Sequence, residues 1–191
     1  MNIEQIQQQV IAGNQLQIVG NQSHIKTTSK PTLDMAHYSG LIGYHPEELV
    51  MTAKAGTRIK DIESILAHKG QTLPFSVHDH DNATIGGAYA LGSPELRDAV
   101  LGVKIIDGRG RLLNFGGQVM KNVAGYDVAR LLVGSKGKLA VICEISFRVL
   151  PKAYAINSMP SAALTIATSS PLREHIELGL KNVFDPNGVF V

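Results

Sequence analysis

Residues 83–106 read ATIGGAYALGSPELRDAVLGVKII, and this stretch decides how the middle of the chain folds. Gly86 and Gly87 stand side by side after Thr84. Adjacent glycines let a backbone pass close to a bulky group or adopt a positive φ, so the pair predicts that another group lies against this loop. The apolar run from Val100 onward predicts a buried strand directly after it.

The run continues into a predicted hairpin and, further along, a long strand. VLGVKII at 100–106 and RLLNF at 111–115 flank a turn that contains Gly108 and Gly110. Residues 139–151 carry apolar side chains at alternate positions, which predicts a strand covered on one side and ended by Pro151. The residues on that face are Leu139, Val141, Cys143, Ile145, Phe147 and Val149.

Apolar residues at helical spacing predict three helices. The first begins near Ile3 and stops at Gly13, and the second covers 57–69 with Thr57 as N-cap and Gly70 as stop. The third begins at Pro171 and ends at the DPNG of 185–188. Its expected buried face carries Leu172, Ile176, Leu180 and Val183.

With the remaining segments, the sequence predicts an α+β fold without βαβ alternation. Strands are predicted at 16–19 (LQIV) and 48–53 (ELVMTA), separated by a turn-rich stretch, and a short helix at 127–137 (DVARLLVGSKG). Residues 152–170 are weakly patterned and predict a linker with at most one short strand.

Composition bounds the class of protein. A chain of 191 residues with 44% hydrophobic and 18% charged residues is long enough to bury a core as one domain, of one or two lobes. A net charge of +2 with few aromatic residues excludes a typical nucleic-acid binder. Cys143 is the single cysteine, which excludes an internal disulfide or an iron–sulfur cluster held by this chain alone. The polar start and the lack of an apolar run of ~20 residues predict a cytoplasmic protein without a transmembrane segment.

Several separated glycine loops are the main functional signal. They contain Gly20, residues 84–87, KNVAGYD at 121–127 and GSKG at 134–137. Backbone N–H groups from such loops can surround an anionic ligand, although glycine is also the common residue of ordinary turns. GRGRLL at 108–113 and GSKGKL at 134–139 lack the spacing of dinucleotide-binding and P-loop fingerprints. The residues alone leave a ligand site and simple turns as open alternatives.

A family resemblance favours the ligand site. ELVMTAKAGTRIKDIESILAHKGQTLPF (48–75), GGQVMKNVAGYDVARLLVGS (116–135) and LKNVFDPNGVF (180–190) resemble the FAD-binding E subunit of bacterial glycolate oxidase. That family belongs to the flavoproteins with a vanillyl-alcohol-oxidase, or PCMH-type, FAD-binding domain. The resemblance runs through most of 38–151 and returns at 172–190.

The resemblance implies an α+β PCMH-type fold of two subdomains with FAD between them. It assigns 1–151 to the FAD-binding domain, 152–170 to a linker that replaces the usual cap domain, and 171–191 to a C-terminal helix and tail packed on the FAD domain. Residues 83–87 match the second pyrophosphate loop, where N–H groups would reach the phosphates. The cofactor contacts it implies are Gly20, Ser23, Pro74, Ala83, Thr84, Ile85, Gly86, Gly87, Asn122, Val123, Ala124, Gly125, Tyr126, Gly134, Ser135, Gly137, Leu139 and Val141.

The sequence departs from the family in two places. The first pyrophosphate loop lacks the usual arginine and two glycines and reads VGNQSH at 19–24. Loss of a charged partner and strain at Gln22 would weaken noncovalent FAD binding by about two to three decades. The short 152–170 segment leaves no room for the cap domain that lines the substrate site. No catalytic residue is therefore assigned within this chain.

The implied function is the FAD-binding subunit of a glycolate oxidase complex, which oxidises glycolate to glyoxylate with flavoprotein and iron–sulfur partner subunits. Such a chain would be cytoplasmic, reaching the inner membrane through those partners, and a homo-oligomer is a further option for covering the open cleft. The alternatives are a structural subunit of the same fold that has lost FAD and a stand-alone flavin reductase.

Individual residues outside the specific motif are expected to be ordinary loop, core or surface residues. His24 stands one position beyond the site of covalent flavin attachment, so no covalent flavin is expected. HDHD at 78–81 is expected to be a solvated loop and not a metal site, because consecutive residues seldom converge on one ion. Cys143 is expected to pack in the core. Tyr126 is expected to stack near the flavin, whereas Lys121 and Arg130 fit phosphate contacts and surface charges equally well.

Overall fold

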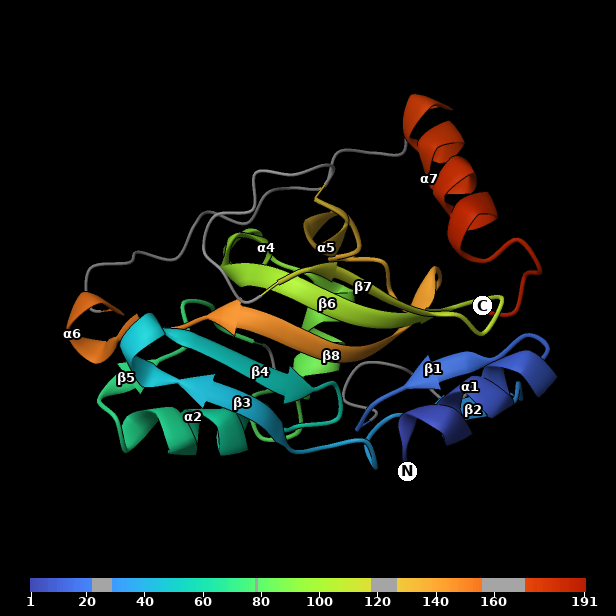
Figure 1. The fold of residues 1–191 in the computed structure, drawn as a ribbon. Coiled ribbons are helices and arrows are strands. Elements are labelled where there is room, and N and C mark those ends of the chain that lie inside the picture. The colour runs from blue at the N-terminus through green and yellow to red at the C-terminus, as the bar shows by residue number, and fades with distance from the viewer. Residues whose placement is uncertain (22–28, 78, 118–126, 156–170) are drawn as a thin grey trace.

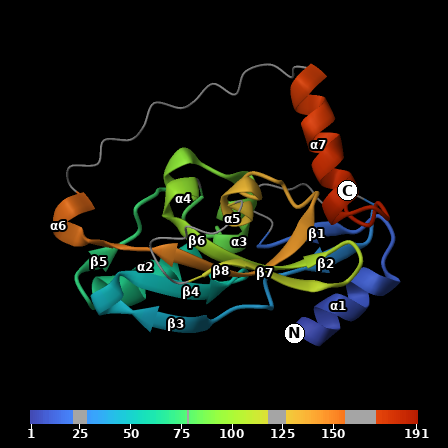
Figure 2. The same ribbon diagram turned by 45° about the horizontal axis from the view of Figure 1, so that its top comes forward.

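Figure 1 shows the computed structural model, which describes residues 1–21, 29–77, 79–117, 127–155 and 171–191. A five-stranded antiparallel sheet with strand order β3-β4-β8-β6-β7 forms its centre. The parallel pair β1-β2 and helix α1 lie beside one end of that sheet in both views (Figures 1 and 2). The strand bounds are β1 (Gln17–Val19), β2 (Thr32–Asp34), β3 (Leu41–His45), β4 (Val50–Lys54), β6 (Val100–Asp107), β7 (Leu112–Gly116) and β8 (Ala140–Arg148).

Strand β8 is the middle of the sheet and pairs with β4 on one side and β6 on the other. Its first half is buried on both faces, since Ala140 and Ile142 are buried as well as Val141 and Cys143. Only in 144–148 do half-buried polar side chains alternate with buried apolar ones. The predicted strand is confirmed. The prediction that it is covered on one side holds only for its second half. Helix α3 (Ile85–Leu91) packs against β8.

The hairpin and most of the predicted helices are confirmed. Strands β6 and β7 pair in register around the turn at 108–111. Asp107 is fully buried there, and its carboxylate accepts hydrogen bonds from the backbone N–H groups of Arg109 and Arg111. The confirmed helices are α1 (Ile3–Ala12), α2 (Ile59–Ala67), α5 (Val128–Leu131) and α7 (Pro171–Phe184).

Several elements were not predicted from the sequence. The turn-rich stretch before 48 contains β2 and β3, and the glycine loop and small-residue run at 84–99 contain two helices, α3 (Ile85–Leu91) and α4 (Pro94–Ala99). Two glycines in seven residues argue against a helix by propensity, because glycine costs about 1 kcal/mol relative to alanine. Tertiary packing overrides that preference in α3.

The start of α2 differs from the prediction. Arg58, not Thr57, is the N-cap residue, and its side chain makes no capping hydrogen bond. The Thr57 hydroxyl instead donates to the Lys54 carbonyl at 2.7 Å and accepts from the Gly40 N–H at 3.0 Å. Thr57 therefore ties the end of β4 to the loop that precedes β3.

The segment after β8 is partly helical. Strand β9 (Leu150–Pro151) pairs with β5 (Gln71–Thr72), and α6 (Lys152–Ala155) follows at once, where the sequence predicted a linker with at most one short strand. The rest of that predicted linker, 156–170, lies outside the described residues.

Helix α7 contacts the body only near its C-terminal end. It stands away from the central sheet in both views (Figures 1 and 2). Phe184 is buried and packs edge-to-face on Phe115, with ring centroids 6.3 Å apart. Of the face predicted to pack on the FAD-binding domain, only Leu180 is half-buried against the core among the described residues. The other three are exposed: Leu172 is 69%, Ile176 52% and Val183 62% exposed.

Close backbone packing explains Gly86. Its N–H donates to the Ala55 carbonyl at 2.8 Å, and a Cβ built on it would stand 2.7 Å from the Ala55 Cβ. Both Gly86 and Gly87 have helical φ values, so neither needs the positive φ that the sequence allowed. The group that lies against Gly86 is the protein's own backbone at Ala55.

Substitution of Gly86 should destabilise the fold. In Gly86→Ala the added methyl overpacks against Ala55, and we expect the free energy of unfolding to fall by about 1–3 kcal/mol. Chemical denaturation followed by circular dichroism measures this difference.

Gly87→Ala is the matched control. A Cβ at Gly87 meets only the Thr84 Oγ1, at 3.2 Å, and alanine favours a helix over glycine by about 0.5–1 kcal/mol. We expect this variant to be as stable as the parent within about 1 kcal/mol. Equal stability of the two variants would show that the Ala55 contact does not restrict residue 86.

Candidate functional site

Three of the predicted glycine segments meet around α3. Gly20, at the end of β1, faces the Thr84 side chain: a Cβ built on it would stand 3.0 Å from Thr84 Oγ1. The Asn21 side-chain amide donates to the Asn82 carbonyl at 3.1 Å. The structure therefore brings the first and second predicted pyrophosphate loops into direct contact.

The N–H groups of the second loop are used inside the protein. Ile85 N–H donates to Thr57 O, Gly86 N–H to Ala55 O, and Gly87 N–H to Thr84 Oγ1 at 3.1 Å. The expectation that the glycine N–H groups are open to a phosphate is wrong here. Gly86 N–H anchors α3 to Ala55, directly after β4, and Gly87 N–H is bonded to the N-cap side chain of its own helix. Ala83, Thr84 and Ile85 are also buried.

The loop 134–137 lies beside the other end of α3. Gly134 N–H donates to Tyr89 O at 3.0 Å and Lys136 N–H to Ala90 O at 2.9 Å. Gly134 and Gly137 both have positive φ, +86° and +74°, which explains why glycine occupies these two positions. A Cβ on Gly137 would lie 3.5 Å from the Ile18 Cβ, so this loop also reaches β1.

Ser135, in the same loop, carries an orphaned polar atom. Its Oγ is buried and has no hydrogen-bond partner among the residues that the structure describes. A buried hydroxyl without a partner costs about 1–3 kcal/mol, and such groups in native proteins usually contact a ligand, ion or water. This atom is the clearest sign that the loop is built to meet another molecule.

The other predicted contacts are placed less favourably. Val141 is fully buried, and its register partner in β6 is Ile106, so its side chain belongs to the core. Leu139 is half-buried at the start of β8. Pro74 is half-buried beside Phe75, whose ring packs edge-to-face on Phe147.

Residues 118–126 of the most specific motif lie outside the described residues. They include Lys121 and the predicted flavin-side residues Asn122, Val123, Ala124, Gly125 and Tyr126. Gln22, Ser23 and His24 of the first loop also lie outside them. Arg130 is described: it is exposed and pairs with Asp127 at 3.3 Å. Of the two roles considered for Arg130, a phosphate contact and a surface charge, the structure shows a surface ion pair.

Arg58 is an exposed residue beside the candidate site that the sequence analysis did not indicate. It forms an antiparallel bridge with Thr84, flanked by the hydrogen bonds Ile59 N–H to Ala83 O and Ile85 N–H to Thr57 O. Opposite residues of such a pair project from the same face, so the Arg58 side chain leaves the backbone on the Thr84 side. Nothing in the sequence signals this pairing, because 26 positions separate the two residues.

An ion pair holds the loop that leads into Thr84. His80 bonds through Nε2 to the Glu63 carboxylate on α2, and Asp81 lies 3.8 Å from its Nδ1. The hydrogen bond to Glu63, followed by the Glu63 charge, raises the pKa of His80 above its ordinary value, and Asp81 raises it further. Residues 79–82 are exposed, as expected for a solvated loop, and His78 lies outside the described residues.

Comparison with known proteins decides the family. Residues 5–116 match the model of the FAD binding domain. The chain belongs to this FAD-binding-domain family. It is also 41% identical to glycolate oxidase subunit GlcE of Escherichia coli (strain K12), over 90% of this chain and 51% of that protein. Glycolate oxidase subunit GlcD of Bacillus subtilis (strain 168) is 31% identical over 61% of the chain and 26% of its own length.

Solved structures support the same fold. An alkyldihydroxyacetonephosphate synthase superposes with a TM-score of 0.62 at 18% identity, covering 78% of this chain and 29% of that enzyme. The α+β PCMH-type fold and the resemblance to the glycolate oxidase E subunit are thereby confirmed. The chain spans about half the length of the GlcE protein that it matches.

The described residues of this FAD-binding domain fit the cofactor in part. The buried Ser135 hydroxyl is suited to a polar ligand, whereas Gly20 packs against the Thr84 side chain. Within those residues no three His, Cys, Asp or Glu side chains are grouped to hold a metal ion, and no helix has the length and apolarity to cross a bilayer. Cys143 is fully buried, and burial raises the pKa of its thiol to about 12, which confirms a packing role.

The His80 ion pair should respond to pH. Because His80 binds its proton more tightly in the folded state, its stabilising contribution is complete below its ordinary pKa and is lost as the pH rises through the raised folded pKa. We expect NMR titration of its ring protons to give a pKa above 6.5, and Glu63→Gln to lower it.

Glu47→Gln, on the exposed turn η1 (Pro46–Glu48), makes the same charge change away from His80 and should leave that pKa unchanged. An unshifted His80 in the parent chain would show that the ion pair is not populated in solution.

Proposed function

We propose that this chain is the FAD-binding subunit of a glycolate oxidase complex, which oxidises glycolate to glyoxylate together with partner subunits. The observation that carries the proposal is the 41% identity to GlcE across 90% of the chain. The meeting of Gly20, Thr84 and the 134–137 loop around α3 supports it. We propose that FAD is held noncovalently, because His24 stands one position beyond the site of covalent flavin attachment.

The proposed cofactor contacts come from three places. The Ser135 hydroxyl supplies a hydrogen bond, the backbone at Gly20, which packs on Thr84, borders the ligand, and Arg58 supplies a positive charge for the pyrophosphate. The flavin-side contacts remain those of 122–126, with Leu139 and Pro74 at the margin. When bound, FAD supplies the electron-acceptor chemistry that hydroxy-acid oxidation requires.

FAD binding is proposed to be weaker than in the relatives. Val19 is 1% exposed and packs in the core, so the position where the family places an arginine offers no charge to a phosphate. The Gly86 and Gly87 N–H groups are already bonded within the protein. These same observations favour the alternative function, a structural subunit that keeps the fold without FAD.

The exposed face of α7 supports the proposal of partner subunits. Leu172, Ile176 and Val183 lie along one side of the helix and are each more than half exposed. A continuous apolar stripe of this kind commonly marks a protein interface. We assign the flavoprotein and iron–sulfur subunits of the complex as partners, with a second copy of the chain as the alternative occupant, and a cytoplasmic location that reaches the inner membrane through the partners.

FAD uptake is the direct test of the cofactor. We expect the purified chain to bind added FAD, measured by the quenching of flavin fluorescence. Arg58→Gln should weaken binding by about tenfold, because a hydrogen bond to a charged group contributes about 1.5–3 kcal/mol.

Lys69→Gln is the matched control, since it removes the same charge just after the other end of α2, ~16 Å away. It should leave the affinity unchanged. Absence of any FAD uptake by the parent chain would reject the cofactor and favour the structural subunit.

Turnover tests the assignment of catalysis to the complex. The isolated chain loaded with FAD should not reduce an artificial electron acceptor with glycolate, and addition of the partner subunits should restore turnover. Ile176→Asp should weaken association with those subunits by placing a charge in the apolar stripe, as measured by size-exclusion chromatography.

Ser64→Asp, at an exposed position of α2, adds the same single negative charge and should leave association intact. Robust glycolate turnover by the isolated chain would place the substrate site within this chain and overturn the assignment.

A further inference from the structure

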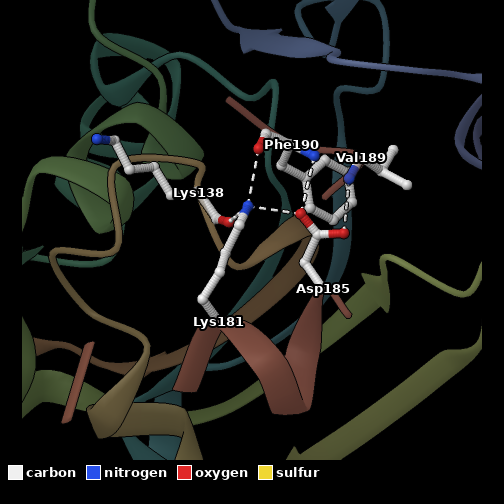
Figure 3. A network of polar contacts seen from close by, with 5 residues as sticks. All are labelled: Lys138, Lys181, Asp185, Val189 and Phe190. Atoms are coloured by element: carbon white, nitrogen blue, oxygen red, sulfur yellow. Dashed lines mark hydrogen bonds and ion pairs between the residues drawn. The ribbon is translucent and has the colours of Figure 1, made fainter. Parts of the chain in front are cut away.

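The Lys181 ammonium group joins three parts of the chain. Figure 3 shows its Nζ donating to the Lys138 carbonyl at 2.7 Å, the Phe190 carbonyl at 2.7 Å and Asp185 Oδ2 at 2.5 Å. An ammonium group has three N–H donors, so each is matched by one acceptor. The Lys181 side chain is only 28% exposed, although it lies on a helix whose other face is open to solvent.

Asp185 completes the network from the end of α7. Its side chain is fully buried, and its carboxylate accepts the Val189 N–H at 2.8 Å and the Phe190 N–H at 2.9 Å in addition to Lys181 (Figure 3). Gly108 of the β6–β7 turn packs directly on it, and Gly108 N–H donates to Phe184 O at 2.8 Å. A buried carboxylate with this many donors holds the tail in one conformation.

The tail and the ammonium group reach both sides of the candidate site. Leu16 N–H donates to Val189 O at 2.6 Å and Val191 N–H to Leu16 O at 3.2 Å. The tail therefore pairs with Leu16, which directly precedes β1 and Gly20. Lys181 holds the Lys138 carbonyl, directly after Gly137. The network therefore spans from the 134–138 loop, through the tail, to the strand that carries the first glycine loop.

We infer that Lys181 and Asp185 are positioning residues for the cofactor site, which hold the 134–138 loop and β1 in the relative arrangement that the ligand requires. The inference rests on the proposed function for the identity of the ligand, FAD. Neither residue is assigned a contact with FAD, and the inference concerns the ammonium group of Lys181 specifically, not the bulk of its side chain.

Chemical rescue tests the ammonium group. In Lys181→Cys, 2-bromoethylamine alkylates the thiolate: a sulfur–carbon bond forms, bromide leaves, and the product carries an ammonium group at nearly the length of lysine. Cys143 should not react, because it is fully buried and its pKa is raised to about 12. We expect Lys181→Cys to bind FAD about tenfold more weakly than the parent, a change of about 1.4 kcal/mol, and aminoethylation to restore the affinity.

Asn182→Cys, treated in the same way, is the control, because Asn182 is the exposed neighbour of Lys181 on the same helix. Its affinity should match the parent before and after alkylation. An unchanged affinity in Lys181→Cys, or a loss that aminoethylation does not reverse, would overturn the inference.

Hydrogen exchange separates this inference from the proposed function. The amides of Ser135, Lys136 and Lys138 are hydrogen-bonded within the loop or to α3. In the FAD-free chain, Lys181→Cys should speed exchange at these amides, and aminoethylation should slow it again, whether or not the parent binds FAD. If the parent binds no FAD, the proposed function fails while the exchange data still decide the role of Lys181; unchanged exchange would then refute it.

Discussion

The backbone of residues 55–59 is the connection on which the rest of the structure depends. Ala55 donates its N–H to Cys143 O at 2.7 Å and accepts the Gly86 N–H through its carbonyl at 2.8 Å, so one residue links the middle strand of the sheet to α3. Two further hydrogen bonds, from Ile85 to Thr57 and from Ile59 to Ala83, extend the link. Because α3 is held this closely, residue 86 has no space for a side chain.

The candidate site follows from that connection. Two other glycine segments lie at the two ends of α3. Thr84 faces Gly20 at one end, and the 134–137 loop is hydrogen-bonded to the other end. The buried network at Asp185 is a second connection, which ties the tail to β1 and to the same loop. Two interactions that are remote in sequence thus place loops from four regions of the chain around one short helix.

The exposed face of α7 is the second feature that bears on the function of this FAD-binding domain. The chain spans about half the length of the GlcE protein that it matches, and α7 extends from the body with an exposed apolar stripe. Under the proposed function, the loops around α3 would hold FAD and the α7 stripe would contact partner subunits.

The sequence by itself determined the elements with a regular apolar period, such as α2 and the β6–β7 hairpin, and the motifs determined the family. It did not predict α3, because glycine propensity argues against a helix at 85–91, and tertiary contacts, among them the one with Ala55, override that propensity. It predicted that α7 packs on the FAD-binding domain, but a period cannot tell which surface covers a face. The Arg58–Thr84 bridge and the Lys181 network were decided by tertiary structure alone, because hydrogen bonds between distant residues leave no pattern in either local segment.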